Sequence, residues 1–329
     1  MGTVTISTSE MNTFLRCRRK YYYQYIEKLV PKRQPVPITK GTLIHSALEA
    51  YYKGEDWTAP LRDAEVEAKK NFFEEELAEF QNIIADAYKV VRAYIHYART
   101  SGIDQGIQIL DVEKPFKVRL PNGHIFEGKM DLIYRNEAGL WIRDHKTTGQ
   151  IPKEGSRFID VQTAMYYAAA KVIYKETPLG VEINYIKSSP PKEPKLTSKG
   201  TMSRESIDTD WATYEAALRK AGLNPGDYLD MQEKLSGKIF FKTERMPRPV
   251  HLVKQIIKET CAVADEIAKV HNTPVEEQFF PRFIDRSCEW GCPYKDLCHA
   301  ELIGVNADFI RMDKYTKADQ PVMQSEEDD

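Results

Sequence analysis

Hydrophobic and polar positions alternate with a period of two in residues 125–148, the stretch around which the rest of the chain is organised. Apolar side chains recur at every second position on both sides of a polar break that contains Asn136 and Gly139. This period is typical of strands with one buried face, and asparagine and glycine are common turn residues. The pattern therefore predicts a β-hairpin.

Three charged residues follow the alternation of this hairpin. Asp144 and Lys146 should share one strand face and His145 should point to the other, while the hairpin would bring Asp131 near Asp144. Two carboxylates and an ammonium group are costly to bury without a partner, and a divalent cation would use the carboxylates as oxygen ligands. Taken alone, such a pattern is more often a solvated strand face, so the choice depends on the rest of the chain.

Helical periodicity dominates the first hundred residues. A capping-box pattern at residues 7–10 predicts a helix that runs into the tyrosine-rich residues 21–25. Three prolines between residues 31 and 37 predict a linker. Gly41 then opens a second predicted helix, which carries His45 and Glu49 on one face because they are four residues apart.

The pattern after residue 107 predicts an α/β core. Two strands, followed by a hairpin turn at residues 121–123, precede the hairpin of residues 125–148, and a helix and a further strand come after it. A polar, turn-rich segment at residues 188–206 and two helical regions complete the chain. The predicted strands are 109–112, 116–120 and 182–186, and the predicted helices are 60–100, 159–174, 209–235 (with an interruption at 224–226) and 250–271.

Composition narrows the class of protein. The 329 residues contain 42% hydrophobic residues and carry a net charge of −2, so the chain can build a substantial core and any nucleic-acid surface must be local. No apolar run is long enough to cross a membrane and the N-terminus does not resemble a signal peptide. We therefore expect a soluble cytoplasmic protein without a membrane partner. Five cysteines, three of them at 288, 292 and 298, argue against a disulfide scaffold and suggest a metal or cluster site.

The most basic segment of the chain coincides with the tyrosine-rich helix. Interleaved cations and aromatic rings suit a groove for single-stranded nucleic acid, where bases stack and phosphates pair. A half-buried helix with snorkelling cations explains the same pattern equally well. The residues predicted to contact DNA under the first interpretation are Arg16, Arg18, Arg19, Lys20, Tyr21 and Tyr22.

Taken together and in order, the motifs resemble the RecB-like exonuclease branch of the PD-(D/E)XK nuclease superfamily, in the iron–sulfur form also seen in AddB and the CRISPR-associated exonucleases. The similar stretches are the cysteine motif around Cys17, Gly41-Thr-Leu-Ile-His45, Gly128-Lys-Met-Asp131, Asp144-His-Lys146, Gln162-Thr-Ala-Met-Tyr166 and the trio Cys288, Cys292 and Cys298. The first two of these cysteines are separated by three residues where two are common in relatives. No Walker A pattern is present, so the helicase module of larger relatives is not expected.

The resemblance implies a restriction-endonuclease-like core, a mixed central sheet flanked by helices, with a metal-dependent active site. His45, Asp131, Asp144 and the backbone carbonyl of His145 would hold one or two Mg²⁺ or Mn²⁺ ions. Lys146 would orient the nucleophile or offset developing charge. Gln162 and Tyr166 would line the site from a helix, and Glu49 and Glu113 are candidates for an outer shell.

The resemblance also implies a [4Fe–4S] cluster held by Cys17, Cys288, Cys292 and Cys298. On ligand count alone, four thiolates suit a structural Zn²⁺ ion equally well. Such a site would join the two ends of the chain. Cys261 lies in an apolar helical pattern and is predicted to belong to the core.

The expected function is that of a metal-dependent DNA exonuclease acting on single strands or duplex ends, in recombination, repair or replication in a bacterium or a phage-infected cell. A separate helicase or recombination protein is a candidate partner. The alternatives are a structure-specific endonuclease that cleaves flaps or junctions, a catalytically inactive DNA-binding subunit, and a zinc-stapled structural protein. We divide the sequence into a basic N-terminal segment (1–40), a helical region with the histidine motif (41–106), the nuclease core (107–190), an insertion (191–249), a C-terminal helix with the cysteine segment (250–304) and an acidic tail predicted to be disordered (305–329).

Overall fold

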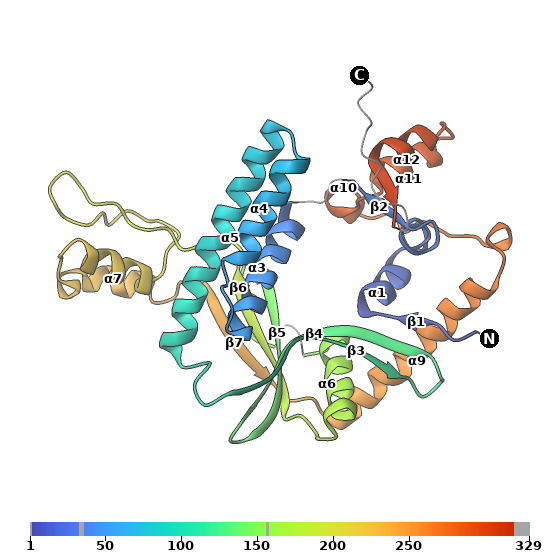
Figure 1. The fold of residues 1–329 in the computed structure, drawn as a ribbon, viewed down its shortest axis with the longest axis horizontal. Helices are drawn as coiled ribbons and strands as arrows, with labels where there is room; N and C mark the ends of the chain where they lie inside the picture. Colours follow the sequence, from blue (N-terminus) through green and yellow to red (C-terminus); the bar gives the residue numbers. More distant parts are fainter. Residues whose placement is uncertain (1, 33–35, 156–157, 319–329) are drawn as a thin grey trace. The chain divides into compact units, whose positions relative to one another are not determined.

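The computed structural model describes residues 2–32, 36–155 and 158–318. The chain forms two compact units, each built from segments far apart in sequence. Unit 1 combines Met1–Pro35, Pro115–Gly128 and Val250–Asp329, and unit 2 combines Val36–Lys114 and Lys129–Pro249. Figure 1 shows the path of the chain through both.

A mixed β-sheet runs through unit 2. The strands β4 (Ile125–Asn136), β5 (Gly139–Thr148), β6 (Gly180–Lys187) and β7 (Phe241–Met246) are neighbours in that order, and β3 (Gln108–Arg119) pairs with β4. The β5–β6 pair is parallel, whereas β4–β5 and β6–β7 are antiparallel. The predicted α/β class with a mixed sheet flanked by helices is therefore confirmed.

The predicted hairpin is the β4–β5 pair. Its register opposes Asn136 to Gly139 across a two-residue turn, and the Asn136 side chain accepts the peptide N–H groups of Ala138 and Gly139 at 3.0 and 3.2 Å. The asparagine thus stabilises the turn, as its position in the sequence indicated. Because β5 and β6 are parallel, they require a crossover, which the helix α6 (Val161–Tyr174) supplies.

Helices cover both faces of this sheet. The helices α3 (Val36–Lys53), α4 (Ala59–Asn71) and α5 (Glu74–Ser101) pack together, and α3 and α5 contact β5 and β6 (Figure 1). Their apolar stripes bury a common core that includes Ile44, Leu48, Val91, Leu132 and Ile186. Neighbouring side chains of a strand alternate between faces. Arg143 and His145 of β5 point toward α3 and α5, and the residues on either side of them point toward α6 on the opposite face.

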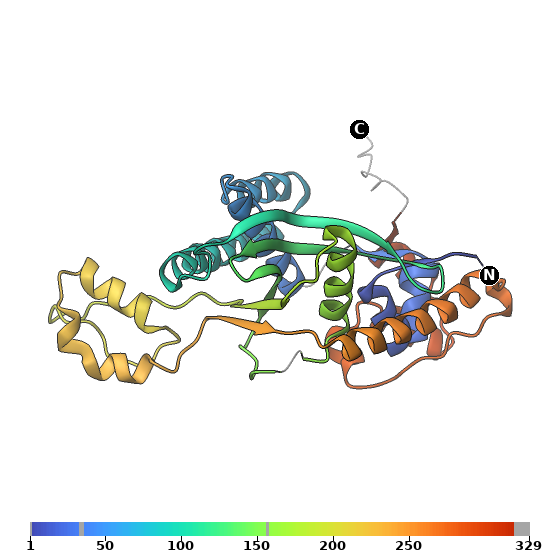
Figure 2. The same cartoon turned by 90° about the horizontal axis from the view of Figure 1, so that it is seen from below.

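An excursion between β6 and β7, residues 188–240, is called the arm below. It contains α7 (Trp211–Lys220), the 3₁₀ turn η2 (Pro225–Tyr228) and α8 (Leu229–Leu235). Figure 2 shows the arm leaving the ends of β6 and β7 as a separate lobe of unit 2. It has its own apolar core of Met202, Tyr214, Leu218, Tyr228, Met231 and Leu235.

Unit 1 is mainly helical. β1 (Thr5–Ile6) pairs in parallel with Ile125 and Phe126, and β2 (Leu29–Pro31) pairs with β8 (Tyr315–Lys317). Tyr23, Leu29 and Tyr294 belong to its apolar core. Its helical elements are α1 (Thr8–Arg16), α2 (Arg18–Tyr21), the π-helix η1 (Tyr22–Ile26), α9 (Val250–Asn272), η3 (Val275–Glu277), α10 (Ser287–Gly291), α11 (Lys295–Leu302) and α12 (Asp308–Lys314).

Four local expectations need correction. The predicted helix over residues 8–25 is broken at Cys17, whose φ of −153° is extended. The second helix starts at Val36 rather than Gly41, because a proline is tolerated in the first turn. Where a disordered tail was predicted from residue 305, the structure has α12 and β8, and residues 319–329 lie outside the described part. Cys261 is only partly buried on α9, so it is not a core residue.

None of the described helices is long and apolar enough to span a membrane.

Candidate active site

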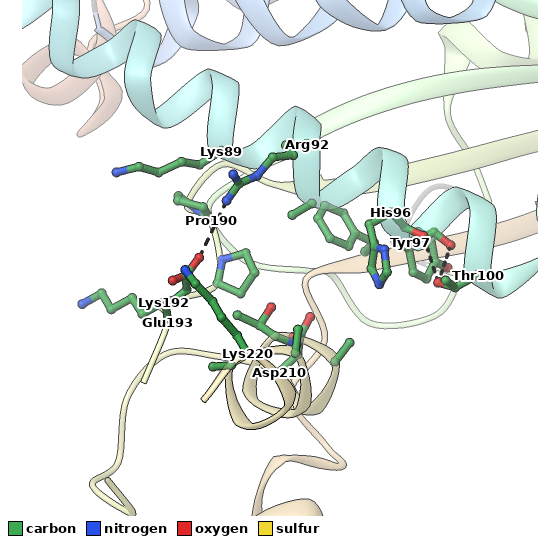
Figure 3. A pocket seen from close by; sticks show the side chains of 17 residues that line it. Lys89, Arg92, His96, Tyr97, Thr100, Pro190, Lys192, Glu193, Asp210 and Lys220 are labelled. Carbon is green, nitrogen blue, oxygen red and sulfur yellow. Dashed lines mark hydrogen bonds and ion pairs between the residues drawn. The ribbon is translucent and has the colours of Figure 1, made fainter. Parts of the chain in front are cut away.

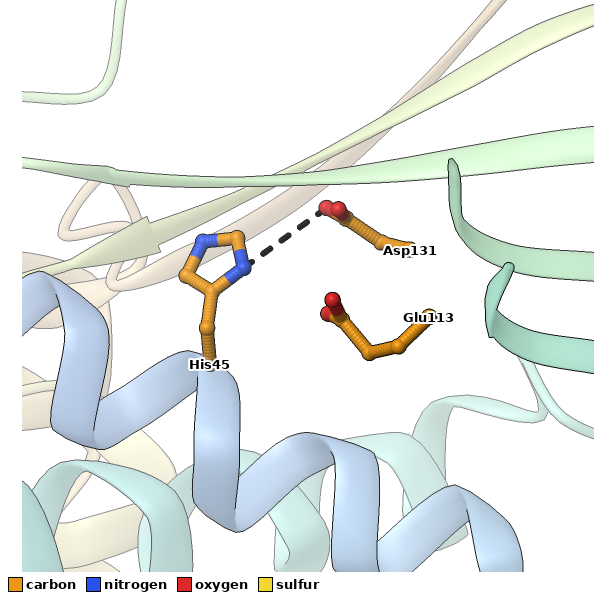
Figure 4. Close-up of side chains that lie close together, drawn as sticks. All are labelled: His45, Glu113 and Asp131. Atoms are coloured by element: carbon orange, nitrogen blue, oxygen red, sulfur yellow. Dashed lines mark ion pairs between the residues drawn. The ribbon is translucent and has the colours of Figure 1, made fainter. Parts of the chain in front are cut away.

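A histidine and two carboxylates from three different elements meet in unit 2 (Figure 4). His45 of α3, Glu113 of β3 and Asp131 of β4 each offer a ligand atom, and these atoms lie within 4.8 Å of one another. His45 Nδ1 is 3.7 Å from Asp131 Oδ2. Among the described residues, no other group of three or more histidine, cysteine, aspartate or glutamate side chains is this close.

Glu113 enters the group through an unusual backbone conformation. Its φ is +50°, in a region that non-glycine residues seldom adopt and that is often found where function requires a particular side-chain direction. The carboxylate forms an ion pair with Lys129 and its side chain is only 8% exposed. The sequence suggested an outer-shell role, but the geometry makes Glu113 a candidate ligand. Strand periodicity could not show this, because one residue with positive φ changes the direction of the side chain.

Asp144 and Lys146 occupy neighbouring positions on one face of β5. Lys146 Nζ lies 2.8 Å from Asp144 Oδ2 and donates a 2.7 Å hydrogen bond to Gln162 Oε1. Gln162 in turn donates to Tyr166 Oη at 2.9 Å, one helical turn along α6. The predicted motif residues on the strand and on the helix thus form one connected chain, which fixes the position of the ammonium group.

Asp131 lies on β4, across the ladder from Asp144 of β5. The β4–β5 register pairs Leu132 with Arg143, so Asp131 and Asp144 are the next residues along the ladder. The peptide N–H of His145 donates to Asp131 Oδ2 at 2.7 Å. Because this hydrogen bond orients the peptide between Asp144 and His145, it also holds the backbone of the Asp144-His-Lys146 motif in place.

The His145 side chain is buried in a polar network on the opposite face. Its Nδ1 lies 2.8 Å from Asn184 Nδ2, and its ring stacks on Tyr52 with the centroids 5.5 Å apart. Asn184 also donates to Tyr94 Oη at 2.7 Å. These contacts connect β5 and β6 with α3 and α5, the helices that cover this face. The imidazole therefore supports the motif from behind, and its ring also meets the His45 ring edge-on, with the centroids 6.2 Å apart.

The electrostatics of the site favour a cation. Burial raises the pKa of Asp131 well above its usual range, and the nearby carboxylates of Asp144 and Glu113 raise it further. Burial also raises the pKa of Glu113, and it lowers the pKa of His45, which favours the neutral imidazole. Buried carboxylates that resist ionisation, next to an imidazole that can donate a lone pair, form a donor set that suits Mg²⁺ or Mn²⁺. The residues present fit such an ion.

An open cavity of 490 Å³ gives access to these groups. Glu49, the other candidate for an outer shell, lines this cavity, but its carboxylate pairs with Lys53 at 2.6 Å. A second cavity of 610 Å³ begins at Lys146 and extends along Thr148 and Asp160. Lys146 and Thr147 line both cavities, so the ammonium group lies where the two meet.

The basic N-terminal residues pack within unit 1. Tyr21 is fully buried and donates to Glu10 at 2.9 Å, and Tyr22 packs against Phe280. Arg18 pairs with Glu266 at 2.7 Å, Arg19 pairs with Glu301, and Arg16 lies 3.9 Å from Asp285. This is the arrangement expected from the half-buried helix, the alternative that the sequence left open. DNA contacts by these residues and by Lys20 remain a prediction.

The cysteines lie around one peptide segment but do not form a close ligand group. Cys17 Sγ accepts the peptide N–H of Phe283 at 3.5 Å, the Cys288 thiol donates to the Phe283 carbonyl at 3.6 Å, and Arg282 donates to Cys298 Sγ at 3.2 Å. Burial raises the pKa of Cys292, and the neighbouring Cys288 and Cys17 side chains raise it further. Within the described part of the chain, no three thiols lie within 4.8 Å of one another. The predicted four-cysteine cluster is therefore not shown.

Comparison with known proteins assigns the family. A sequence profile of the PD-(D/E)XK nuclease superfamily matches residues 5–299. The chain belongs to this superfamily. No curated protein matches the chain. A solved structure titled "Crystal structure of SSO0001" is similar at 10% identity, with a TM-score of 0.33, and the match covers 91% of this chain and 87% of that one. As a PD-(D/E)XK protein, the chain is expected to act as a nuclease on nucleic acid, with the His45, Glu113 and Asp131 group as a candidate divalent-metal site.

Proposed function

We propose that this protein is a metal-dependent DNA exonuclease that hydrolyses phosphodiester bonds in single strands or at duplex ends. The observation that carries the proposal is the convergence of His45, Glu113 and Asp131 beside the Asp144–Lys146–Gln162 chain. Two independent sets of contacts therefore support this assignment of the site. The proposed setting is DNA recombination, repair or replication in a bacterium or a phage-infected cell.

The residues of the site divide the work of hydrolysis. His45, Glu113, Asp131 and Asp144 would hold Mg²⁺ or Mn²⁺, with help from the His145 carbonyl. A bound ion of this kind polarises a phosphate and lowers the pKa of water. Lys146, held by Asp144 and Gln162, places a positive charge at the junction of the two cavities, where it would orient the attacking water and offset charge on the phosphate. Tyr166 keeps Gln162 in position.

A cleavage assay tests this assignment. Linear and circular DNA, each single- and double-stranded, would be incubated with Mg²⁺, Mn²⁺ or EDTA. We expect cleavage of linear substrates with either metal and none with EDTA. Cleavage of closed circles would favour the structure-specific endonuclease instead, and a protein that binds DNA without cleaving it would be the inactive accessory subunit.

The first prediction concerns three side chains of the site. Asp131→Ala, Asp144→Ala and Lys146→Ala should each abolish cleavage while binding of single-stranded DNA in EDTA stays close to that of the wild type, because these groups act on the scissile phosphate. Glu49→Ala provides a control, since Glu49 lines the same cavity but is paired with Lys53, and this variant should stay active. Normal turnover in any of the first three variants would refute the assignment.

We further propose that Cys17, Cys288, Cys292 and Cys298 hold a [4Fe–4S] cluster, which would place the protein in the RecB-like iron–sulfur branch. Support comes from their shared neighbourhood around Arg282 and Phe283 and from N–H groups directed at Cys17 and Cys298, since hydrogen bonds to sulfur tune such clusters. A single Zn²⁺ ion, with Zn–S bonds of about 2.3 Å, needs the four sulfurs closer together than they are here.

A further inference from the structure

A groove of 880 Å³ lies between α5 and the arm, apart from the residues of the active site (Figure 3). Its floor and walls come from three segments of unit 2: α5, the start of the arm at residues 190–193, and α7. Phe241, the first residue of β7, also lines it. The groove thus depends on the insertion at residues 191–249, for which the sequence motifs gave no role.

One continuous stripe of α5 forms a wall of the groove. Lys89, Arg92, Ala93, His96, Tyr97 and Thr100 line it, and their spacing of three or four residues places them on one helix face. At 1.5 Å per residue the stripe is about 16 Å long. The opposite face of α5 is apolar and packs into the core through residues such as Val91 and Ile95. Ala93 and Tyr97 also pack against this core, and the polar residues of the stripe form a second face that the fold leaves open.

The wall contributed by α7 is lined by small side chains. Ala212, Ala216 and Ala217 face the groove, while Tyr214 and Leu218 of the same helix pack into the core of the arm. If this crevice existed only to fix the arm to α5, large apolar side chains would be expected to fill it, because protein interiors are closely packed. The alanines instead leave open space between the two helices.

The charges in the groove are predominantly positive. Lys89, Lys192 and Lys220 line it, and none of them forms an ion pair with any residue that the structure describes. Both acidic lining residues are already engaged. Asp210 caps α7 by accepting the peptide N–H of Thr213 at 2.8 Å, and Glu193 lies 3.7 Å from Arg92. In a chain with a net charge of −2, three lysines without partners along one groove form a local site for anions.

We propose that this groove binds the backbone of single-stranded nucleic acid, as a second contact surface for the substrate of the proposed nuclease, and the inference rests on that function. Lys89, Lys192 and Lys220 come from three different segments and lie along an open channel, which suits successive phosphates better than one compact phosphate group. His96 and Pro190 supply flat surfaces for bases between and beside the cations.

The sheet places the groove at the same end of the strands as the active site. In the β5–β6 register Lys146 pairs with Tyr185 and Thr148 pairs with Lys187, and the chain then continues directly into the lining residues Pro190 and Lys192. Lys146 of the candidate site and the groove thus lie toward the carboxyl ends of two adjacent parallel strands, β5 and β6. A strand held in the groove would keep the substrate bound between cleavage events.

The test measures binding of a fluorescent oligothymidylate in EDTA, where cleavage cannot occur, over a series of salt concentrations. The variant Lys89→Ala/Lys192→Ala/Lys220→Ala should bind about tenfold more weakly at about 0.15 M salt, and the slope of log K against log salt should fall by about 2, because each phosphate contact to a single strand contributes about 0.7. The matched control is Lys195→Ala/Lys199→Ala/Lys238→Ala, which removes the same charge from exposed positions of the arm outside the groove. An equal loss in the control would overturn the proposal.

A second variant tests the groove without changing its charge. Ala216→Trp should occupy the space between α7 and α5 and weaken oligothymidylate binding, and wild-type affinity in this variant would contradict the proposal. Binding of a nucleoside triphosphate as tight as that of the oligonucleotide, lost in the lysine variant, would identify a nucleotide site instead.

The two proposals can fail separately. If the wild type does not cleave DNA but the lysine variant loses binding, the nuclease assignment fails and the groove stands. If cleavage is confirmed and both triple variants bind equally well, only the groove fails.

Discussion

At the scale of single residues, the site is a compromise between stability and function. Asp131 is held next to Asp144 and Glu113 in a buried position, so both neighbouring carboxylates oppose its ionisation. Such an arrangement lowers the stability of the metal-free fold, and a bound cation would offset that cost. The superfamily chemistry thus predicts a measurable effect on folding, independent of any cleavage assay.

The second prediction follows from this cost. Asp131→Asn should raise the melting temperature of the metal-free protein at pH 7. A carboxyl group whose pKa is raised on folding favours the folded state fully at pH values below its unfolded pKa, and this contribution is lost as the pH rises through the folded pKa. The amide removes the charge but can still accept the His145 N–H. The gain should therefore disappear as the pH is lowered to about 4.

Calorimetry with and without Mg²⁺ checks this prediction. Added Mg²⁺ should stabilise the wild type and leave Asp131→Asn almost unchanged. Asp63→Asn, at an exposed position of α4, should show neither effect. A variant at position 131 that melts below the wild type in EDTA at pH 7 would contradict the proposed strain.

Most residues of the site could be predicted from the sequence because they lie in short motifs whose spacing is local. The alternation along β5 placed Asp144 and Lys146 on one face, and the hairpin register brought Asp131 beside them. Glu113 was underestimated because its direction depends on one backbone torsion angle. The packing of Tyr21 and Arg19 could not be predicted either. Tyr21 pairs with the nearby Glu10, whereas Arg19 pairs with Glu301 at the other end of the chain, and no local pattern indicates such a partner.

At the scale of elements, the buried Arg143 network determines how β5 is attached to its neighbours. Arg143 is fully buried on the face of β5 opposite Asp144, and it donates to Glu182 of β6, to Tyr52 of α3 at 3.0 Å and to the Ile103 carbonyl at 2.9 Å. Glu182 also accepts from Arg245 of β7 at 2.8 Å. One guanidinium therefore links the strand that carries Asp144 and Lys146 to the next strand and to a covering helix.

The third prediction tests this link. Arg143→Met should destabilise the protein by about 3–5 kcal/mol, because it leaves the Glu182 carboxylate buried beside fewer donors. Urea unfolding gives the free energy. Arg143→Met/Glu182→Met should recover part of the loss, whereas Arg219→Met, which breaks an exposed pair with Glu215, should cost no more than about 0.5 kcal/mol. If Arg143→Met lowers the free energy of unfolding as little as Arg219→Met does, the network does not contribute to stability as proposed.

Elements with a strong period or a clear cap were the most predictable. Ser7 accepts the Glu10 N–H at 3.2 Å, as its capping pattern indicated. β7 was missed because its sequence Phe-Lys-Thr-Glu-Arg-Met has weak alternation, and its pairing with β6 decides its conformation. The break at Cys17 was also missed, because it depends on the tertiary position of the cysteine and not on helix propensity.

At the scale of the whole molecule, the proposed cluster and the nuclease site belong to different units. Cys17, Cys288, Cys292 and Cys298 all lie in unit 1, whereas His45, Asp131, Asp144 and Lys146 all lie in unit 2. The interleaving of segments that creates these units depends on long-range strand pairing, and no local pattern in the sequence could have shown it.

The fourth prediction uses this separation. Protein purified without oxygen should be brown and contain about four irons per chain. Cys17→Ala should lose the iron and destabilise the fold, because a link between residues so far apart in sequence restricts the unfolded chain by about 4–5 kcal/mol in the chain-entropy picture of a comparable disulfide. Cys261→Ala, a change on α9 at a cysteine outside the predicted ligand set, should keep both iron and stability.

Absorbance spectra, iron analysis and thermal unfolding provide the readouts. A colourless wild type with one zinc ion would replace the cluster with a zinc site. Full iron content in Cys17→Ala would exclude Cys17 as a ligand.

Because unit 1 is divided among three separate segments of the chain, it cannot be completed until late in translation. Both segments of unit 2 have been synthesised once Pro249 has left the exit tunnel, so this unit can fold while translation continues. The first 35 residues must wait for the helices that begin at Val250. During that interval Tyr21 lacks its contact with His271 and Tyr23 lacks its contact with Tyr294, and a nascent chain stalled before Val250 would expose both side chains to chaperones and proteases.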